Sequence, residues 1–464
     1  MRNSPVLAFP VRIWQQRHSS WWAQVTVIAA ILLLSAALPL RFSSRLIMLA
    51  MAVVAGAGAI LVLLRYPPLG LAAIIVGGLL LPIDISVSAG SKFNAAMLIT
   101  LLMTVLWLAD MIIRRRRIEL VLSRPLIPLL AFLAVAVLAF GVGQRSWFFF
   151  ALTAPITAQI GGLVLFFLSA CALLLSAHLI RDLRWLQALT WLFVGAASLF
   201  VISQLIPPLK RPLSRLFQYG ATSSLFWTWL MALSLSQALF NRKLPLGARL
   251  ALGLFAGSIL YVSYTLVPGW KSGWVPALAT AGVLLLLRFP PLIAVGVAGG
   301  IVAAPTALSY LIASDEYSYS TRLEAWNLIL EIVKVNPLLG LGPANYHWYT
   351  PLFPIRGYAV RFNSHNQYID LIAQTGLIGL SCFLWFAWEI GRLGWQLRQT
   401  AAEGFARAYA NGAFAGLVGT LIAGILGDWI LPFVYNIGFV GFRGSVLAWL
   451  FLGGLIALEQ MRTR

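Results

Sequence analysis

The sequence predicts an all-α integral membrane protein, a bundle of helices that crosses the bilayer about 12 to 14 times. Hydrophobic residues make up 61% of the 464 residues and charged residues only 10%, far below the roughly 25% charged that is typical of soluble domains. Apolar runs close to 20 residues long recur along nearly the whole chain, as a hydrocarbon core about 30 Å thick requires. The charges lie between these runs, and Gly and Pro occur within them, as membrane helices tolerate.

The expected spans follow one another with short connections until one long polar loop interrupts them. They are 22–40, 46–64, 69–83, 95–113, 126–142, 160–180, 186–206, 221–240, 250–267, 273–287, 292–312, 368–390, 408–426 and 438–457. The third and tenth are short enough for one of them to be re-entrant. The chain thus divides into transmembrane helices over 1–312, a loop over 313–367 and further transmembrane helices over 368–464.

Positive charge sets the expected orientation. The net charge is +20, from 33 Lys and Arg against 13 Asp and Glu. If the N-terminus is cytoplasmic, most cations, including the run Arg114–Arg117, fall in inner segments, as the positive-inside rule requires. Both termini are then cytoplasmic and the loop 313–367 lies outside. No water-facing module is long enough to gather these charges for nucleic acid.

Several cations fall on the outer side, where the same rule disfavours them, so we expect some of them to bind an anionic ligand. They are Arg41, Arg45, Lys92, Arg145, Lys210, Arg211, Arg215, Lys271, Arg322, Lys334, Arg356, Arg361 and Arg443. For Arg41 and Arg45 the simpler reading is preferred, in which they cap helices at the level of the lipid headgroups.

The long loop is predicted to contain one short amphipathic helix. Thr321 and Glu324 have the spacing of a capping box, with Thr321 as N-cap, and apolar residues then recur at helical spacing over 323–333. Asn336-Pro337 ends the helix, and two glycines form the turn that follows. In the first turn, Arg322 would lie beside free backbone N–H groups, a combination that suits a phosphate.

Guanidinium and imidazole groups converge at the end of the loop, where Arg356 and Arg361 precede His365. The outer side lacks cytosolic nucleotides, so an activated sugar must arrive there on a lipid carrier, usually through a pyrophosphate. Arginines can neutralise the departing pyrophosphate, and a histidine can accept the proton of the acceptor hydroxyl. The alternative for His365 is an interfacial residue bonded to a carbonyl.

The remaining reactive residues argue against other chemistries. The acidic residues include no Asp-x-Asp pattern, and the adjacent pair Asp315-Glu316 lies at an expected helix exit, which disfavours a metal-dependent transferase. Cys171 and Cys382 both fall inside apolar runs and give no disulfide or metal pattern. We therefore expect neither a metal nor a cofactor.

A set of residues in and after the loop has a recognisable order and spacing. It comprises Arg322, Trp326, the turn Pro337-Leu338-Leu339-Gly340-Leu341-Gly342, His365-Asn366, Gly376 and Gly379. In these residues the chain resembles the O-antigen ligase and O-antigen polymerase superfamily, bacterial inner-membrane glycosyltransferases of the GT-C type. The resemblance covers about 60 residues, and the other spans match only in hydropathy and number.

The resemblance implies a function in lipopolysaccharide biosynthesis at the periplasmic face. It implies that Arg322 contacts the undecaprenyl pyrophosphate of the donor and that His365 acts as the base at the acceptor hydroxyl, for example on lipid A core. The glycan would be transferred with inversion and without metal. Asn366, Trp326, Gly340 and Gly342 would support the site.

Two earlier segments depart from the family pattern. Where relatives carry a Ser-Arg-Gly-like motif, this chain has Lys271 followed by Ser272 and Gly273, so the charge is kept and the bidentate fork is lost. Lys271 is carried over as a pyrophosphate contact, with Arg356 and Arg361. Arg211 and Arg215 could widen this cradle, and a headgroup anchor explains them equally well.

Aromatic residues follow the glycine turn, and they have two readings. His347 with Tyr346, Trp348 and Tyr349 could face sugar, but an interfacial aromatic belt explains them as well.

Other functions share part of this pattern. An O-antigen polymerase or a protein O-oligosaccharyltransferase would use the same chemistry with a different acceptor. A transporter or flippase of lipid-linked glycans would also be polytopic and basic, but it would carry ionisable groups at mid-span or internal repeats. Asp110, His178 and Glu389 lie within the expected spans, all near the inner ends rather than at mid-span, so the enzyme is preferred.

Overall fold

The computed structural model describes residues 44–463, with gaps at 89–90, 218–219, 267–268 and over much of 292–315. The span expected at 22–40 lies outside the described residues, as do most of the span at 292–312, Arg41 and Asp315. The chain divides into two units, 1–66 and 67–464. The described part of the first unit is helix α2 (Ser44–Arg65), which matches the span expected at 46–64.

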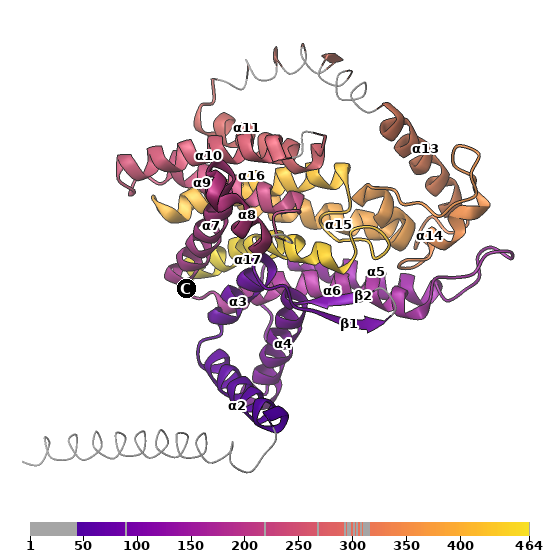
Figure 1. The fold of residues 1–464 in the computed structure, drawn as a ribbon, viewed down its shortest axis with the longest axis horizontal. Helices are drawn as coiled ribbons and strands as arrows, with labels where there is room; N and C mark the ends of the chain where they lie inside the picture. Colours follow the sequence, from indigo (N-terminus) through magenta and orange to yellow (C-terminus); the bar gives the residue numbers. More distant parts are fainter. Residues whose placement is uncertain are drawn as a thin grey trace, which may run out of the picture. The chain divides into compact units, whose positions relative to one another are not determined.

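The second unit is helical apart from one β-hairpin (Figure 1). Its α-helices are α3 (Pro68–Leu79), α4 (Ala95–Ala109), α5 (Leu126–Val142), α6 (Ile156–Leu179), α7 (Leu183–Leu205), α8 (Pro207–Leu216), α9 (Ser224–Phe240), α10 (Leu246–Leu266), α11 (Lys271–Arg288), α13 (Glu316–Val333), α14 (Tyr346–Tyr349), α15 (Gln367–Thr400), α16 (Phe405–Leu426) and α17 (Phe442–Thr463). A π-helical turn, Asp110–Arg115, extends α4, and short 3₁₀ turns occupy Thr350–Leu352 and Phe439–Gly441. Antiparallel strands β1 (Asp84–Ser88) and β2 (Ser91–Asn94) form the hairpin, which was not predicted.

Among the described residues, 7 helices are long and apolar enough to cross a membrane. They are Ala95–Arg115, Ile156–Leu179, Leu183–Leu205, Leu246–Leu266, Gln367–Thr400, Phe405–Leu426 and Phe439–Arg462. Shorter apolar helices occupy Gly56–Arg65, Pro68–Leu79, Leu126–Val142 and Ser224–Phe240. These findings support a multi-pass helical membrane protein, and the expected number of about 12 to 14 crossings stays a prediction.

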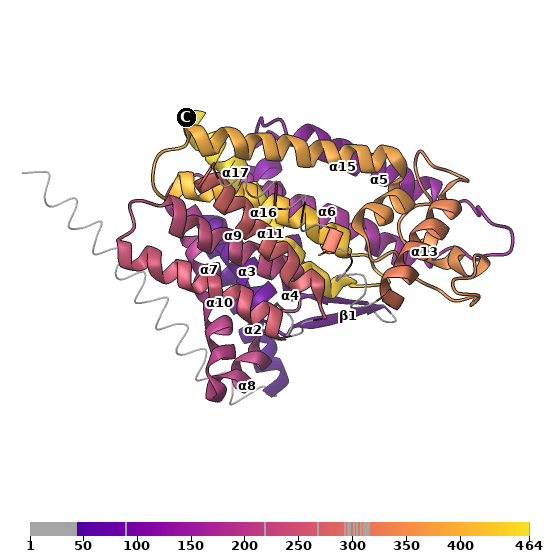
Figure 2. The same cartoon turned by 90° about the horizontal axis from the view of Figure 1, so that it is seen from above.

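The connections of the second unit gather at two opposite ends (Figures 1 and 2). At the end that carries the C-terminus, here called the tail end, Ser123 Oγ donates to Glu459 (2.6 Å) and Arg462 donates to Thr400 (2.5 Å). At the end that carries α13 and α14, here called the loop end, Asn345 Nδ2 donates to Gly143 O (2.9 Å). These bonds join the connection before α5 to the end of α17, and the connection after α5 to the segment that follows α13.

The glycine turn after α13 is hydrogen-bonded into α15. At Gly376 the helix is interrupted by a left-handed φ of 68°, which an L side chain rarely adopts. The N–H group of Leu377 turns to the loop instead and donates to Pro337 O (2.9 Å). From the loop, Leu341 N donates to Ala373 O (2.9 Å). A Cβ on Gly340 would lie 2.6 Å from Gly376 N, so the two segments pack backbone to backbone.

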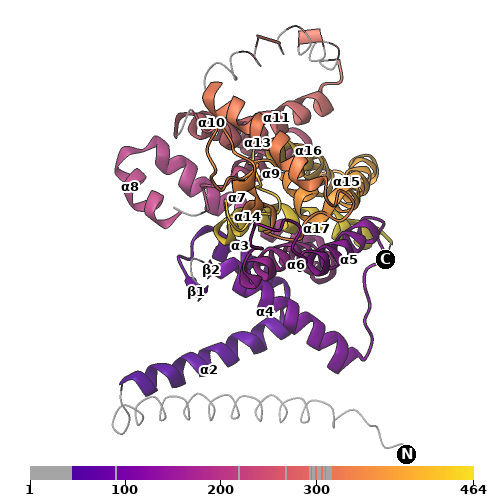
Figure 3. The same cartoon turned by 90° about the vertical axis from the view of Figure 1, so that its right-hand side faces the viewer.

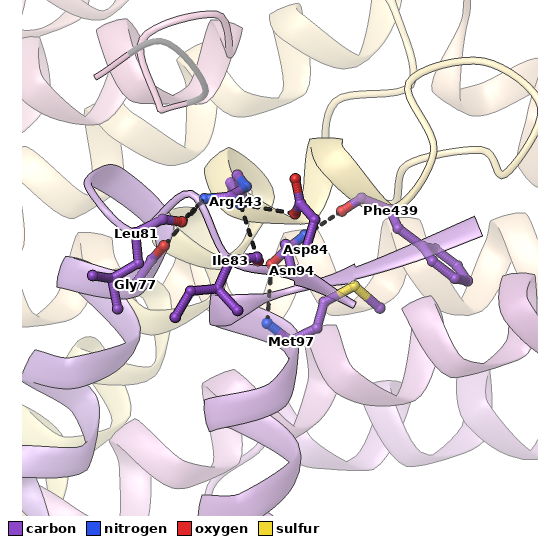
Figure 4. A network of polar contacts seen from close by, with 8 residues as sticks. All are labelled: Gly77, Leu81, Ile83, Asp84, Asn94, Met97, Phe439 and Arg443. Carbon is purple, nitrogen blue, oxygen red and sulfur yellow. Dashed lines mark hydrogen bonds and ion pairs between the residues drawn. The ribbon is translucent and has the colours of Figure 1, made fainter. Parts of the chain in front are cut away.

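Arg443 fastens the hairpin to the rest of the bundle (Figure 4). This residue of the first turn of α17 is 1% exposed, and its guanidinium donates to Leu81 O (2.6 Å) and to Asp84 Oδ1 (2.9 Å). Beside it, Asn94 Nδ2 donates to Phe439 O (2.5 Å). Arg443 is one of the predicted outward cations, and some of these were expected to bind an anionic ligand. Its burial and its bonds to the hairpin segment instead give it a structural function.

Candidate functional site

Helix α13 begins at Glu316, before the position that the capping-box pattern indicated. Thr321 lies inside the helix, and its Oγ1 donates back to Tyr317 O (2.7 Å) rather than accepting from the N3 backbone. The prediction of Thr321 as N-cap was therefore wrong. Arg322 consequently stands in the second turn, away from the free N–H groups of the first.

The buried side of α13 packs on the segments that follow it. Ile329, Ile332 and Val333 are at most 2% exposed and form one cluster with Tyr346 of α14. The predicted helix over 323–333 is confirmed, but Leu323 and Leu330, expected on the same apolar face, are 37% and 38% exposed. Figure 3 looks onto this end, with α13 and α14 in front of the bundle.

The backbone on either side of His365 is fixed by a network of five side chains. Trp326 Nε1 donates to Ser364 O (2.7 Å), so α13 is tied directly to this segment. Ser364 Oγ and Tyr346 Oη both donate to Asp370 Oδ1, at 2.8 and 2.5 Å. Asn366 Oδ1 accepts from the N–H groups of residues 368 and 369 and so caps α15. The supporting residues Trp326 and Asn366 therefore orient the segment from both sides.

His365 itself is held in an unusual conformation, half-buried and with a φ of 49°. A left-handed conformation of a non-glycine residue costs free energy, and such residues cluster at functional sites. The pKa of His365 is lowered from its ordinary value, first by burial and then by the positive charge of Arg322. The two predicted residues thus lie within electrostatic reach of each other, and the imidazole is neutral at pH 7.

A carboxylate behind His365 was missed by sequence reasoning. Asn436 Nδ2 donates to His365 Nδ1 (3.0 Å) and also to Asp428 Oδ1. Burial raises the pKa of Asp428 to about 6. In this arrangement Nδ1 is an acceptor, so the neutral imidazole carries its proton on Nε2. The available signal was a lone aspartate in a short connection between two apolar runs.

Lys271 begins α11 at the loop end. The residue before it, Trp270, packs edge to face on Trp429 with ring centroids 5.9 Å apart. Trp429 directly follows Asp428, so the start of α11 lies beside the segment that holds His365 through Asn436. The structure therefore brings Lys271 to the same region as Arg322 and His365.

The aromatic residues of the loop separate into two groups. Tyr346 and Tyr349 are 0% exposed and belong to the core, so the possibility that they face sugar is wrong. Trp348 and His347 are half-buried, and both contact Tyr435. The guanidinium of Arg361 lies 3.7 Å from the centre of the Trp348 ring. Arg361 and Trp348 thus form an accessible, planar surface.

Other predicted cations are placed elsewhere. Arg356 pairs with Glu324 (Nε to Oε2, 3.2 Å), so its charge is balanced within the loop. Arg211 and Arg215 lie on α8, which packs against α7, and all three cations of this helix are exposed. The geometry therefore supports Arg322 and Lys271 as pyrophosphate contacts more strongly than it supports Arg356, Arg211 or Arg215.

No three His, Cys, Asp or Glu residues in the described part of the chain gather in a way that would hold a metal ion. No model of a known protein family matches the chain, and no curated protein matches it. The resemblance noted for the loop accordingly rests on its own residues.

Proposed function

We propose that this protein is a glycosyltransferase of the O-antigen ligase type. It would transfer a glycan from an undecaprenyl-pyrophosphate carrier to an acceptor hydroxyl, such as one on lipid A core, at the periplasmic face of the bacterial inner membrane. The observation that carries the proposal is the juxtaposition of Arg322 with a neutral, conformationally strained His365. Both residues are held by a loop that is hydrogen-bonded into a membrane helix.

In the proposed reaction the acceptor oxygen attacks the anomeric carbon while the bond from that carbon to the pyrophosphate breaks. The pyrophosphate leaves with the bonding electrons, and Arg322 and Lys271 stabilise its charge. The hydroxyl proton passes to His365 Nε2. Displacement from the face opposite the leaving group inverts the anomeric configuration, and no metal or cofactor is required.

Asn436 determines whether His365 can accept this proton. With the amide nitrogen toward Nδ1, Nε2 carries the proton and donates. When the amide turns, its oxygen accepts from Nδ1–H and from a protonated Asp428, and Nε2 becomes a base. Since burial raises the pKa of Asp428 to about 6, both protonation states are accessible near neutral pH. Asp428 and Asn436 are thus positioning residues in the proposed mechanism.

The planar surface of Arg361 and Trp348 is suited to a sugar ring. Aromatic rings pack against the apolar faces of sugars, and a guanidinium can donate to their hydroxyls. This surface lies next to Tyr435, the neighbour of Asn436 in the chain. We assign Trp348 and Arg361 to glycan positioning, in place of the pyrophosphate contact that the sequence predicted for Arg361.

The proposal is tested by supplying the purified protein with lipid-linked glycan and separate acceptors, and identifying the product by mass. Lipid A core, a second lipid-linked repeat unit and a peptide distinguish ligase, polymerase and protein oligosaccharyltransferase. We expect His365→Ala and Arg322→Ala each to lower turnover at least about 100-fold, with an unchanged unfolding midpoint. Lys334→Ala, which changes an exposed side chain of the same loop, is the matched control. Wild-type turnover by either variant, or activity lost in chelator and restored by a divalent cation, would refute the mechanism.

A further inference from the structure

A cavity of about 150 Å³ lies at the tail end, away from the candidate site. It is formed where α9 and α11 end and α16 begins, and α11 alone separates it from Lys271 by about 27 Å. Arg242, Arg288 and Arg407 line it, together with a single acid, Glu403. The cavity therefore carries an excess of positive charge.

The charges in this cavity are only partly balanced from within. Arg407 Nη1 donates to Glu403 Oε1 (3.0 Å), and the same guanidinium donates to Ala401 O (3.2 Å), which fixes its plane. This ion pair offsets one arginine and leaves the charges of Arg242 and Arg288 in excess. Arg288 ends α11, and its guanidinium lies 5.3 Å from the centre of the Phe289 ring.

The helices around the cavity form a rigid frame. α9, α11 and α16 pack against one another in all three pairings. α9 is buried along nearly its whole length, including Trp227 and Trp229, which are fully buried. Arg288 and Arg407 are thus held on packed helices, as a preformed binding site requires, and Arg242 lies in the short connection that follows α9.

An apolar stripe runs from the same place along α10. Leu246, Leu250 and Leu254 recur every fourth residue on one side of this helix and are 67%, 59% and 77% exposed. Arg249 Nε donates to Ala238 O (2.9 Å), which holds the start of α10 against the end of α9. A headgroup in the cavity would therefore have an acyl-chain surface beside it.

We propose that this cavity binds a phosphate group, with Arg288 and Arg242 as its principal contacts. Arginine forks match phosphate oxygens, and basic pockets between helix ends hold anionic lipid headgroups. The leucine stripe favours a phospholipid as the source of the phosphate over the free ion. This site is independent of the proposed glycosyl transfer.

The test uses the full-length protein in detergent, with intrinsic tryptophan fluorescence to follow thermal unfolding. We expect phosphatidylglycerol to raise the unfolding midpoint more than phosphatidylcholine, and Arg288→Gln to weaken its apparent affinity at least about tenfold. Arg242→Gln, which changes an exposed side chain, provides a second variant that leaves packing intact. Arg184→Gln, an exposed tail-end cation outside the cavity, is the matched control.

Each outcome decides the proposal. A response to phosphatidylglycerol that both cavity variants weaken and Arg184→Gln preserves supports a lipid site. The same pattern with inorganic phosphate alone supports a phosphate site that the free ion fills. Equal weakening by all three variants would mean a diffuse surface potential, and no response to either probe would mean no site. Either of the last two results overturns the proposal.

Discussion

The loop end contains two polar networks, one around Arg443 and one around His365, and they are built in opposite ways. Arg443 is 1% exposed, and its partners are backbone carbonyls and the carboxylate of Asp84. His365 is half-buried, strained in its backbone, and adjacent to a cation that lowers its pKa. The first network satisfies its charge internally, whereas the second places a cation near an imidazole whose charged form it disfavours.

This difference separates structural from functional cations on the same surface. A buried guanidinium surrounded by acceptors stabilises the fold, and removing it leaves those acceptors unpaired. An arginine beside a histidine disfavours the charged imidazole, and an anion arriving from outside relieves that repulsion. Positive charge at the loop end therefore does not by itself identify a ligand site.

The largest effect expected in testing this comparison is on Arg443. Arg443→Ala leaves Asp84 and several carbonyls without their donor, and we expect a loss of about 3–5 kcal/mol of unfolding free energy. Chemical unfolding in detergent measures this loss. Arg145→Ala, at an exposed position of the same end, should change stability by less than about 0.5 kcal/mol. If Arg443→Ala kept full stability and lost only activity, the two networks would not differ as described.

The next effect concerns the junction between the loop and α15. Gly376→Ala introduces a Cβ 2.1 Å from Leu338 O at a φ of 68°, so we expect a loss of about 1–3 kcal/mol and a displaced His365 segment. Unfolding and turnover, measured together, should both fall. Gly195→Ala in α7 is the control, because nothing lies within 4 Å of its added Cβ and the fold should tolerate it. If Gly376→Ala kept its turnover, the junction would not be needed to position the His365 segment.

A smaller effect is expected at the planar surface of Arg361. Trp348→Ala removes the ring on which the guanidinium stacks, and we expect KM for the glycan to rise up to about tenfold with kcat nearly unchanged. Steady-state kinetics separates the two constants. Trp348→Phe should restore much of the affinity, and a fall in kcat alone would place Trp348 with the reacting groups instead.

The smallest effect is a change in pH dependence. The lowered pKa of His365 predicts an acid limb whose midpoint lies below the ordinary value of about 6.5, where the imidazole becomes protonated and turnover falls. A second limb, on the alkaline side, should follow the ionisation of Asp428 near pH 6, so turnover is highest in a narrow range close to pH 6. Asn436→Leu removes the amide that links them, so the alkaline limb should disappear while the acid limb remains. If the wild-type protein and Asn436→Leu had identical pH profiles of turnover, Asp428 and Asn436 would have no part in the mechanism.

The sequence predicts the helices well because each apolar run carries its own length and period. The expected spans at 126–142 and 273–287 correspond to α5 and α11 within two residues at each end. The approach of Arg322 to His365 was also foreseen, because both lie in one loop near a membrane boundary. The start of α13 was missed, since Thr321 bonds back along a helix that already exists.

Other parts of the site depend on contacts between distant segments. His365 and Asn436 are hydrogen-bonded although they lie 71 residues apart in the chain, and no local pattern in either segment indicates this contact. Arg443 and Asp84 lie still further apart in the chain, and the sequence placed Arg443 only among the outward cations, without a partner. The hairpin was missed because it is short and lies between two apolar runs.

The backbone bonds between 337–341 and 373–378 bear on how such proteins can be recombined. A chimera that receives only the loop of a relative would have to rebuild these bonds against a foreign helix kink. Exchanging both segments together keeps donors, acceptors and the glycine pair in register. The exchangeable module is thus discontinuous, consisting of the glycine turn and the first three turns of α15.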